Sequence, residues 1–169
     1  MKKKVIVNVK SNIISQRNES RADFSDISHR LESVAIINGV EWINDSKSTD
    51  IGATCFSLET IRKPIIWIVG SNESKRDLSM ILKLVRLKVC KVICYGKFDT
   101  AIKYSLGEII DHYAYKATLE EAVEMADLWS KKEDAVLFSP ACPSFENYEN
   151  YKMRGNHFKD LVKRIEACN

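Results

Sequence analysis

The sequence has no run of about 18 consecutive apolar residues, the length that a membrane-spanning helix needs, so a transmembrane protein is not expected. Basic residues are scattered along a chain of net charge +3, and their only cluster is Lys2-Lys3-Lys4. A nucleic-acid-binding domain would present a basic stripe with interleaved aromatic residues. The apolar stretch at residues 5–9 is too short for a signal peptide, and no small-residue cleavage site follows it. We therefore expect a protein that binds neither membranes nor nucleic acid.

The five cysteines form no CxxC pair, and the three histidines lie far apart without the spacing of a metal site, so no metal ligand is predicted. An odd number of cysteines without a pairing pattern is typical of a reducing compartment, which favours the cytoplasm. Cys142 lies in a tight, apolar context and is interpreted as a structural thiol, because a nucleophile would need a neighbouring base. No GxxxxGK[ST] phosphate loop occurs in the chain, which excludes that way of binding a nucleoside triphosphate.

The chain contains 169 residues, of which 45% are hydrophobic and 29% charged, and this composition is typical of one globular domain. We predict an N-terminal extension of uncertain order over residues 1–23 and a domain over residues 24–169. Within the extension, valines alternate with other residues at positions 5–9, a pattern compatible with a short strand.

Strand and helix patterns alternate through the domain. Asn38-Gly39 is a strong hairpin-turn signal, so residues 33–37 and 40–44 are predicted to pair as a β-hairpin. Apolar runs typical of strands buried on both faces occur at residues 65–69, 89–95 and 135–138, with a weaker strand at 109–115. Helical spacing or capping signals predict helices at residues 50–62, 78–87, 101–106, 118–132 and around 158–165. This alternation predicts an α/β fold with a mostly parallel sheet flanked by helices.

Three of the predicted strands end in polar segments, at residues 44–49, 70–77 and 139–144. The carboxyl ends of parallel strands meet at one edge of a sheet, where open α/β proteins bind ligands, so we predict a binding crevice there. The first segment has two interpretations. It is either a turn with Thr49 or Asp50 as the N-cap of the next helix, or an anion site formed by Lys47 and that helix N-terminus.

Short motifs follow one another in a fixed order along the chain: His29-Arg30-Leu31-Glu32, Asn38-Gly39-Val40, residues 42–49, 67–70, 121–123 and 139–145, Asn150-Tyr151, Arg154-Gly155 and Phe158. Their order and spacing resemble the C-terminal (glutamate ligase) domain of the Mur ligase family, in particular the MurD type, the UDP-N-acetylmuramoyl-L-alanine:D-glutamate ligases. The resemblance covers nearly everything from Phe24 to about Val162.

This resemblance implies a Rossmann-like domain that holds the incoming amino acid and closes over the nucleotide during peptidoglycan precursor synthesis. In that family, ATP phosphorylates the carboxylate of a UDP-sugar peptide, and the nitrogen of D-glutamate attacks the resulting acyl phosphate. ATP and Mg would be needed only together with a central ATPase domain. Such a ligase is a cell-wall enzyme of the cytoplasm.

The resemblance also implies residue roles. The positions that contact the nucleotide correspond to His29, Arg30, Asp45 and Lys47. The positions that line the D-glutamate site correspond to Thr49, Ser74, Lys75, Ser144, Phe145 and Tyr151. A guanidinium suits phosphate, a carboxylate suits ribose hydroxyls, and hydroxyls near a helix start suit the carboxylates of glutamate. No catalytic residue is assigned.

The sequence departs from the family pattern in the segment at residues 70–77. The family lysine that pairs with a glutamate carboxylate falls on Ser74, and Lys75 lies one residue later. Pro143 occupies a position that is alanine in the family and removes a backbone donor.

The UDP-binding and ATPase domains of the family have no counterpart in these 169 residues, so we expect no ligation by this chain alone. One interpretation is a ligase component that works with a separate chain carrying the other domains. The alternative is a degenerate or repurposed ligand-binding module without ligase activity.

Overall fold

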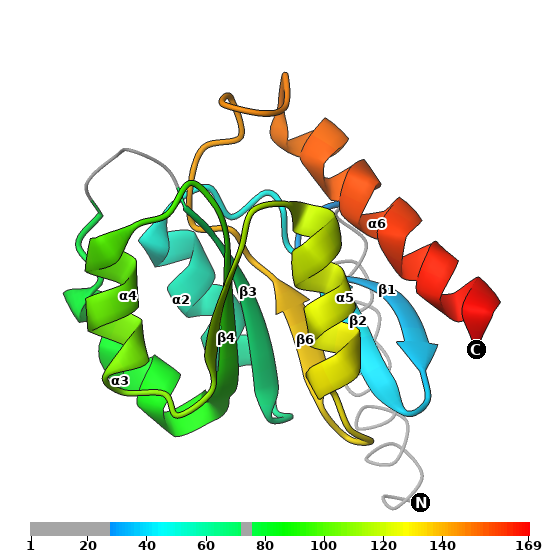
Figure 1. The fold of residues 1–169 in the computed structure, drawn as a ribbon, viewed down its shortest axis with the longest axis horizontal. Helices are drawn as coiled ribbons and strands as arrows, with labels where there is room; N and C mark the ends of the chain where they lie inside the picture. The colour runs from blue at the N-terminus through cyan, green and yellow to red at the C-terminus, as the bar shows by residue number, and fades with distance from the viewer. Residues whose placement is uncertain (1–27, 72–75) are drawn as a thin grey trace, which may run out of the picture.

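The computed structural model describes residues 28–71 and 76–169, which form a sheet covered by helices on both faces (Figure 1). The sheet has six strands in the order β1-β2-β6-β3-β4-β5. The strands are β1 Glu32–Ile37, β2 Val40–Asn44, β3 Ile65–Ser71, β4 Val89–Gly96, β5 Tyr113–Lys116 and β6 Ala135–Phe138. The helices are α2 Ile51–Thr60, α3 Ser79–Lys88, α4 Thr100–Gly107, α5 Leu119–Trp129 and α6 Tyr151–Cys168.

The predicted hairpin is confirmed: β1 and β2 pair antiparallel, and the other neighbouring strands of the described sheet pair in parallel. The turn residues Asn38 and Gly39 have φ angles of 53° and 80°. Two successive positive φ values are typical of the tight turns that match strand twist, and asparagine followed by glycine adopts them readily. The prediction of a mostly parallel α/β sheet is therefore confirmed.

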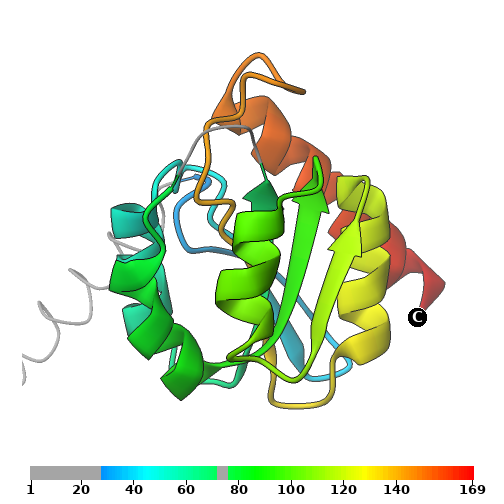
Figure 2. The ribbon, with the colours of Figure 1, turned by 60° about the vertical axis from the view of Figure 1, so that its left-hand side comes forward.

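Each face of the sheet builds its own core. Helices α2, α3 and α4 cover one face, where they pack on strand residues such as Trp67 and Val69. Helices α5 and α6 cover the other face, where Ile66, Ile68 and Phe138 are buried (Figure 2). All seven residues of β3 are buried, as its continuous apolar run predicted.

Several boundaries differ from those predicted by the sequence; the closing helix, for example, begins at Tyr151 rather than near residue 158. The weaker strand begins at Tyr113 rather than at residue 109. The backbone N–H groups of Ile109 and Ile110 instead donate to the carbonyl of Leu106, which continues the turn after α4, and Ile110 is buried in the core. The helix predicted over residues 118–132 ends at Trp129, although its predicted capping box is present. The possible strand at residues 5–9 lies outside the described residues, and none of the described helices is long and apolar enough to span a membrane.

The arrangement of β3 and β6 defines where the sheet opens. These two strands are parallel neighbours, but the chain leaving β3 leads to α3 on one face and the chain leaving β6 leads to α6 on the other (Figure 1). In open α/β sheets, ligands bind at such a divergence, beyond the carboxyl ends of the strands. The geometry of the sheet therefore favours a binding crevice between the segment that follows β3 and the segment that follows β6.

Candidate functional site

The three polar segments meet at one edge of the sheet, as predicted. We name them the β2 loop (residues 44–49), the β3 loop (residues 70–77, of which 72–75 lie outside the described residues) and the β6 loop (residues 139–150). Backbone hydrogen bonds join them: Ala141 N donates to Ser48 O at 3.0 Å, and Gly70 N donates to Pro140 O at 2.9 Å. The β6 loop therefore lies between the other two and touches both.

The side chain of Asn44 fixes the β2 loop from inside. Its Oδ1 accepts the N–H of Ser46 at 3.2 Å, which closes the turn locally. Its Nδ2 lies 3.0 Å from His29 Nδ1 and donates to Glu32 Oε2 at 2.9 Å. Asn44 is fully buried. Neither Asn44 nor Glu32 is among the site residues that the sequence predicts, although an amide at the end of a strand that enters a turn is a recognisable signal.

Asp45 is the most deeply buried carboxylate of the candidate site, with no exposed surface. Its Oδ2 accepts hydrogen bonds from Ser57 Oγ at 2.6 Å and Ser139 Oγ at 2.7 Å, and its Oδ1 accepts from Leu31 N at 3.2 Å. Burial raises the pKa of this carboxyl, and the hydrogen bonds oppose that shift without cancelling it. In this geometry Asp45 binds protein groups rather than presenting an oxygen to a ribose, so its direct nucleotide contact stays a prediction.

We expect Asp45→Asn to change the pH dependence of stability. Because the folded pKa lies above the ordinary value of 3.8, the folded state keeps a proton that the unfolded state has lost, and the contribution of Asp45 falls as pH rises through this window. Urea unfolding from pH 3 upwards should therefore show the free-energy difference between wild type and variant shrinking as pH rises. The exposed Asp160→Asn is the matched control, and a pH-independent difference for Asp45→Asn would contradict the assignment.

His29 lies behind the β2 loop rather than at its surface. Its side chain is only 5% exposed, and burial is the first cause that lowers its pKa, so its imidazole is neutral at pH 7. Its ring contacts the Tyr151 ring edge-on at 6.0 Å between centroids. Lys47 Nζ lies 5.8 Å from the same tyrosine ring, within cation–π range. The structure thus brings His29, Lys47 and Tyr151 together. Arg30, which is also predicted to contact a nucleotide, is half-buried and follows His29 in the chain.

The predicted glutamate-site residues come from four separate segments, the β2 loop, the β3 loop, the β6 loop and α6. Thr49 is half-buried at the end of the β2 loop, and the N-cap of α2 is the next residue, Asp50, which settles the two capping alternatives. Ser144 is buried and Phe145 is 79% exposed on the β6 loop. Tyr151 begins α6, and its carbonyl accepts a hydrogen bond from Ser46 Oγ at 2.9 Å. Ser74 and Lys75 lie outside the described residues.

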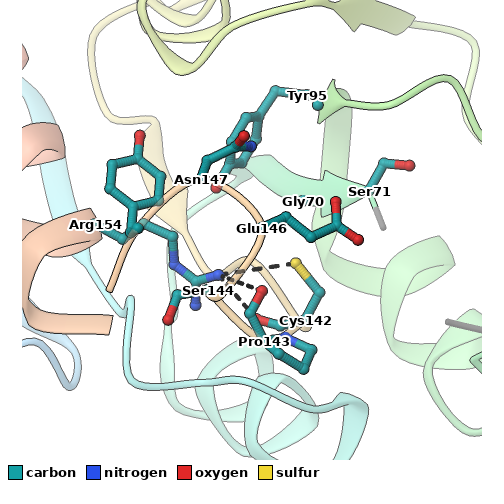
Figure 3. Close-up of a pocket in the computed structure, with 11 residues that line it drawn as sticks. Gly70, Ser71, Tyr95, Cys142, Pro143, Ser144, Glu146, Asn147 and Arg154 are labelled. Carbon is teal, nitrogen blue, oxygen red and sulfur yellow. Dashed lines mark hydrogen bonds between the residues drawn. The ribbon is translucent and has the colours of Figure 1, made fainter. Parts of the chain in front are cut away.

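Arg154 joins α6 to the β6 loop (Figure 3) and also to the β2 loop. It is only 1% exposed. Its Nη1 donates to the carbonyls of Cys142 at 2.9 Å and Pro143 at 3.2 Å, and its Nη2 and Nε donate to the carbonyl and hydroxyl of Ser46 at 2.9 and 3.0 Å. Arg154 belongs to a sequence motif but has no role predicted from the sequence, because its partner Ser46 lies 108 residues before it along the chain.

Arg76 makes the corresponding link on the other side of the β6 loop. Its Nη2 donates to Gly70 O at 2.7 Å, and its Nη1 donates to Ala141 O at 3.0 Å and Pro140 O at 3.3 Å. Cys142 is 4% exposed, and burial raises the pKa of its thiol. This environment agrees with a structural thiol rather than a nucleophile.

A narrow open pocket of about 20 Å³ lies between the β6 loop and the ends of β3 and β4 (Figure 3). It is lined by Gly70, Ser71, Tyr95, Gly96, Cys142, Pro143, Ser144, Glu146, Asn147, Tyr148 and Arg154. Of the predicted site residues that the structure describes, only Ser144 lines it. The pocket therefore lies at the inner side of the loop that carries Ser144.

Comparison with known proteins adds evolutionary evidence to this geometry. Residues 29–142 match the family model described as Mur ligase, glutamate ligase domain. A UDP-N-acetylmuramoylalanine--D-glutamate ligase from Christiangramia forsetii is 42% identical over 147 residues, which are 87% of this chain and 33% of that protein. The protein of the same name from Salinibacter ruber is 35% identical over 147 residues, with 87% and 32% covered. The chain thus spans about a third of the length of these relatives.

Solved structures agree on the fold. UDP-N-acetylmuramate-alanine ligase MurC from Thermotoga maritima superposes with a TM-score of 0.60 at 15% identity, over 87% of this chain and 32% of that one. FolC from E. coli, solved in complex with ADP, superposes with a TM-score of 0.56 at 13% identity, over 83% of this chain and 33% of that one. At these identities the likeness concerns the α/β fold alone.

Proposed function

Because this chain belongs to the Mur ligase family through its glutamate ligase domain, we propose that it is the D-glutamate- and nucleotide-contacting domain of a MurD-type ligase in peptidoglycan precursor synthesis. The observation that carries the proposal is that the segments bearing Thr49, Ser144 and Tyr151 are hydrogen-bonded to one another at the carboxyl edge of the sheet, where Ala141 N donates to Ser48 O and Ser46 Oγ donates to Tyr151 O. The names and identities of the curated relatives support the choice of amino acid.

The amino-acid subsite is proposed around the end of the β2 loop. Thr49 supplies a hydroxyl beside the N-terminus of α2, where backbone N–H groups and the helix dipole favour a carboxylate. The Ala141 N–H donates to the Ser48 carbonyl at 3.0 Å, which keeps the β6 loop beside Thr49. Ser144 supplies a second hydroxyl, and the exposed Phe145 ring together with Tyr151 forms an apolar border.

The nucleotide subsite is proposed at Arg30 and Lys47, whose positive charges suit phosphate oxygens. Asp45 and His29 are proposed to act there by holding the β2 loop, because both side chains are buried. ATP supplies the phosphoryl group that activates the accepting carboxylate. Within residues 28–71 and 76–169, no three His, Cys, Asp or Glu side chains cluster in a way that would hold a metal. We propose that a central ligase domain supplies the Mg site and the phosphate cradle.

Titration calorimetry tests the amino-acid subsite. We expect the 169-residue chain to bind D-glutamate more tightly than L-glutamate, and Thr49→Ala to weaken D-glutamate about tenfold, because one hydrogen bond to a charged group is lost. Thr60→Ala is the matched control, since Thr60 lies at the opposite end of α2 and its hydroxyl donates to Phe56 O. Equal losses in both variants, or no binding by wild type, would argue against the proposal.

Reconstitution separates the proposed function from its alternative. Mixed with a chain that carries the UDP-binding and ATPase domains of a relative, the protein should restore D-glutamate-dependent phosphate release, whereas the 169 residues alone should release none. Binding of D-glutamate without such rescue would favour a repurposed binding module. The feature that favours this alternative is the serine at position 74, where the family pattern has a lysine.

A further inference from the structure

Three polar side chains form a chain of contacts from the β6 loop across α6 to α5. The hydroxyl of Tyr148 lies 2.8 Å from His157 Nδ1, and the two rings lie 5.9 Å apart between centroids. On the other side of the imidazole, His157 Nε2 lies 3.5 Å from Glu120 Oε1. None of these residues has a role in the function proposed above.

Tyr148 and Ser144 belong to one closed turn. The carbonyl of Ser144 accepts the N–H of Tyr148 at 3.0 Å and the N–H of Asn147 at 3.3 Å. Both Tyr148 and Ser144 line the pocket behind the β6 loop. A displacement of the phenol therefore moves the backbone that presents the Ser144 hydroxyl.

Helix α6 holds this turn at both ends. Arg154 binds the carbonyl of Pro143, immediately before Ser144, and His157 binds the side chain of Tyr148, four residues after it. The two α6 residues are three apart, so they lie on neighbouring parts of one helix face. The Arg154 side chain is buried, whereas 31% of the His157 side chain is exposed.

The contact with Glu120 orients the imidazole. A carboxylate beside Nε2 favours the tautomer with its proton on Nε2, which leaves Nδ1 to accept the Tyr148 hydroxyl proton. Glu120 is itself held in the first turn of α5, whose capping box is formed by Thr118 and Glu121. Leu119 and Ala122 anchor this turn in the core. The imidazole thus connects a fixed helix start to a surface loop.

We infer that Tyr148 and His157 are positioning residues of the amino-acid subsite, which hold the turn that presents Ser144, with Glu120 orienting the imidazole. The inference rests on the proposed function for the identity of the ligand. The link between Tyr148 and the turn itself is independent of any ligand. Loss of the link should increase local opening of the turn and weaken D-glutamate binding, each by about fivefold, the effect of one half-buried hydrogen bond.

Three variants test the inference. Tyr148→Phe keeps the ring and removes the hydroxyl, His157→Ala removes the acceptor, and His157→Asn keeps an acceptor close to the position of Nδ1. We expect amide hydrogen exchange at Tyr148 to accelerate about fivefold in the first two variants and to recover in the third. The dissociation constant for D-glutamate should likewise rise in Tyr148→Phe and His157→Ala and recover in His157→Asn. Tyr104→Phe is the control, because Tyr104 is 67% exposed on α4.

The outcomes distinguish the inference from the proposed function. Unchanged amide exchange in Tyr148→Phe would overturn the inference. Faster exchange with unchanged D-glutamate affinity would overturn the positioning role while leaving the proposed function intact. Failure of the wild-type chain to bind D-glutamate would overturn the proposed function and the ligand named in the inference. Even then, faster amide exchange in Tyr148→Phe, together with recovery in His157→Asn, would support the link between Tyr148 and the turn.

Discussion

Arg154→Ala is expected to lower the free energy of unfolding by about 3–5 kcal/mol, because it leaves several acceptors without a donor and removes a large buried side chain. The guanidinium donates to three carbonyls, those of Cys142, Pro143 and Ser46, and to the Ser46 hydroxyl. Truncation would leave these acceptors buried without donors and would open a void between α6 and two loops. Equilibrium unfolding in urea at neutral pH measures the loss.

Two further variants make this result specific. Arg164→Ala removes an exposed guanidinium from the same helix and should change stability by less than about 0.5 kcal/mol. Arg154→Lys keeps the charge but loses the planar fork, so most of the destabilisation should remain. A loss below about 1 kcal/mol in Arg154→Ala would contradict the role given to this residue.

Gly155→Ala is expected to lower the free energy of unfolding by about 1–3 kcal/mol, even though alanine is the better helix former. A Cβ atom at this position would lie 2.2 Å from His29 Nδ1 and 3.0 Å from Ser46 Cβ. The imidazole has little freedom to retreat, because it is buried and its Nδ1 is bonded to the Asn44 amide. The helix would therefore have to move away from the β2 loop.

Gly107→Ala is the matched control for this substitution. Gly107 is exposed at the end of α4, and the nearest atom to an added Cβ is Tyr113 Cγ at 4.0 Å. This variant should be neutral or stabilised by less than about 1 kcal/mol. Thermal unfolding followed by circular dichroism compares the two, and a stabilised Gly155→Ala would show that α6 tolerates a wider separation from His29.

Local patterns predicted most of the secondary structure because they describe interactions between near neighbours. Asn38-Gly39 predicted the hairpin because both residues readily adopt the positive φ angles that its turn requires. Thr118 and Glu121 predicted the start of α5, because residues three apart can form the reciprocal hydrogen bonds of a capping box. The weaker strand was predicted to begin at residue 109, before its actual start, because the apolar Ile109 and Ile110 belong to a turn rather than to a strand. An apolar residue in a sequence signals burial, and burial is compatible with either structure.

The site was predicted less completely, because its decisive contacts join distant segments. The alternation of strands predicted that polar loops share an edge, and this is confirmed by the bonds between the β2 and β6 loops. The sequence does not reveal which polar side chains of a loop point inward. Asp45 and His29 are buried, while Phe145, an aromatic residue, is exposed. The contributions of Asn44 and Arg154 depend on partners that only the folded chain brings together.

The position of β6 has a consequence for the order in which this protein folds. The last strand in the sequence lies in the middle of the sheet, between β2 and β3, so the sheet has no continuous centre until residue 138 has been synthesised and paired. Pairings across about 90 residues are slow to form, because a long loop must close before any contact rewards it. During synthesis on the ribosome, we thus expect Asp45 in the β2 loop to lack its hydrogen-bond partner Phe138 until residue 138 has emerged.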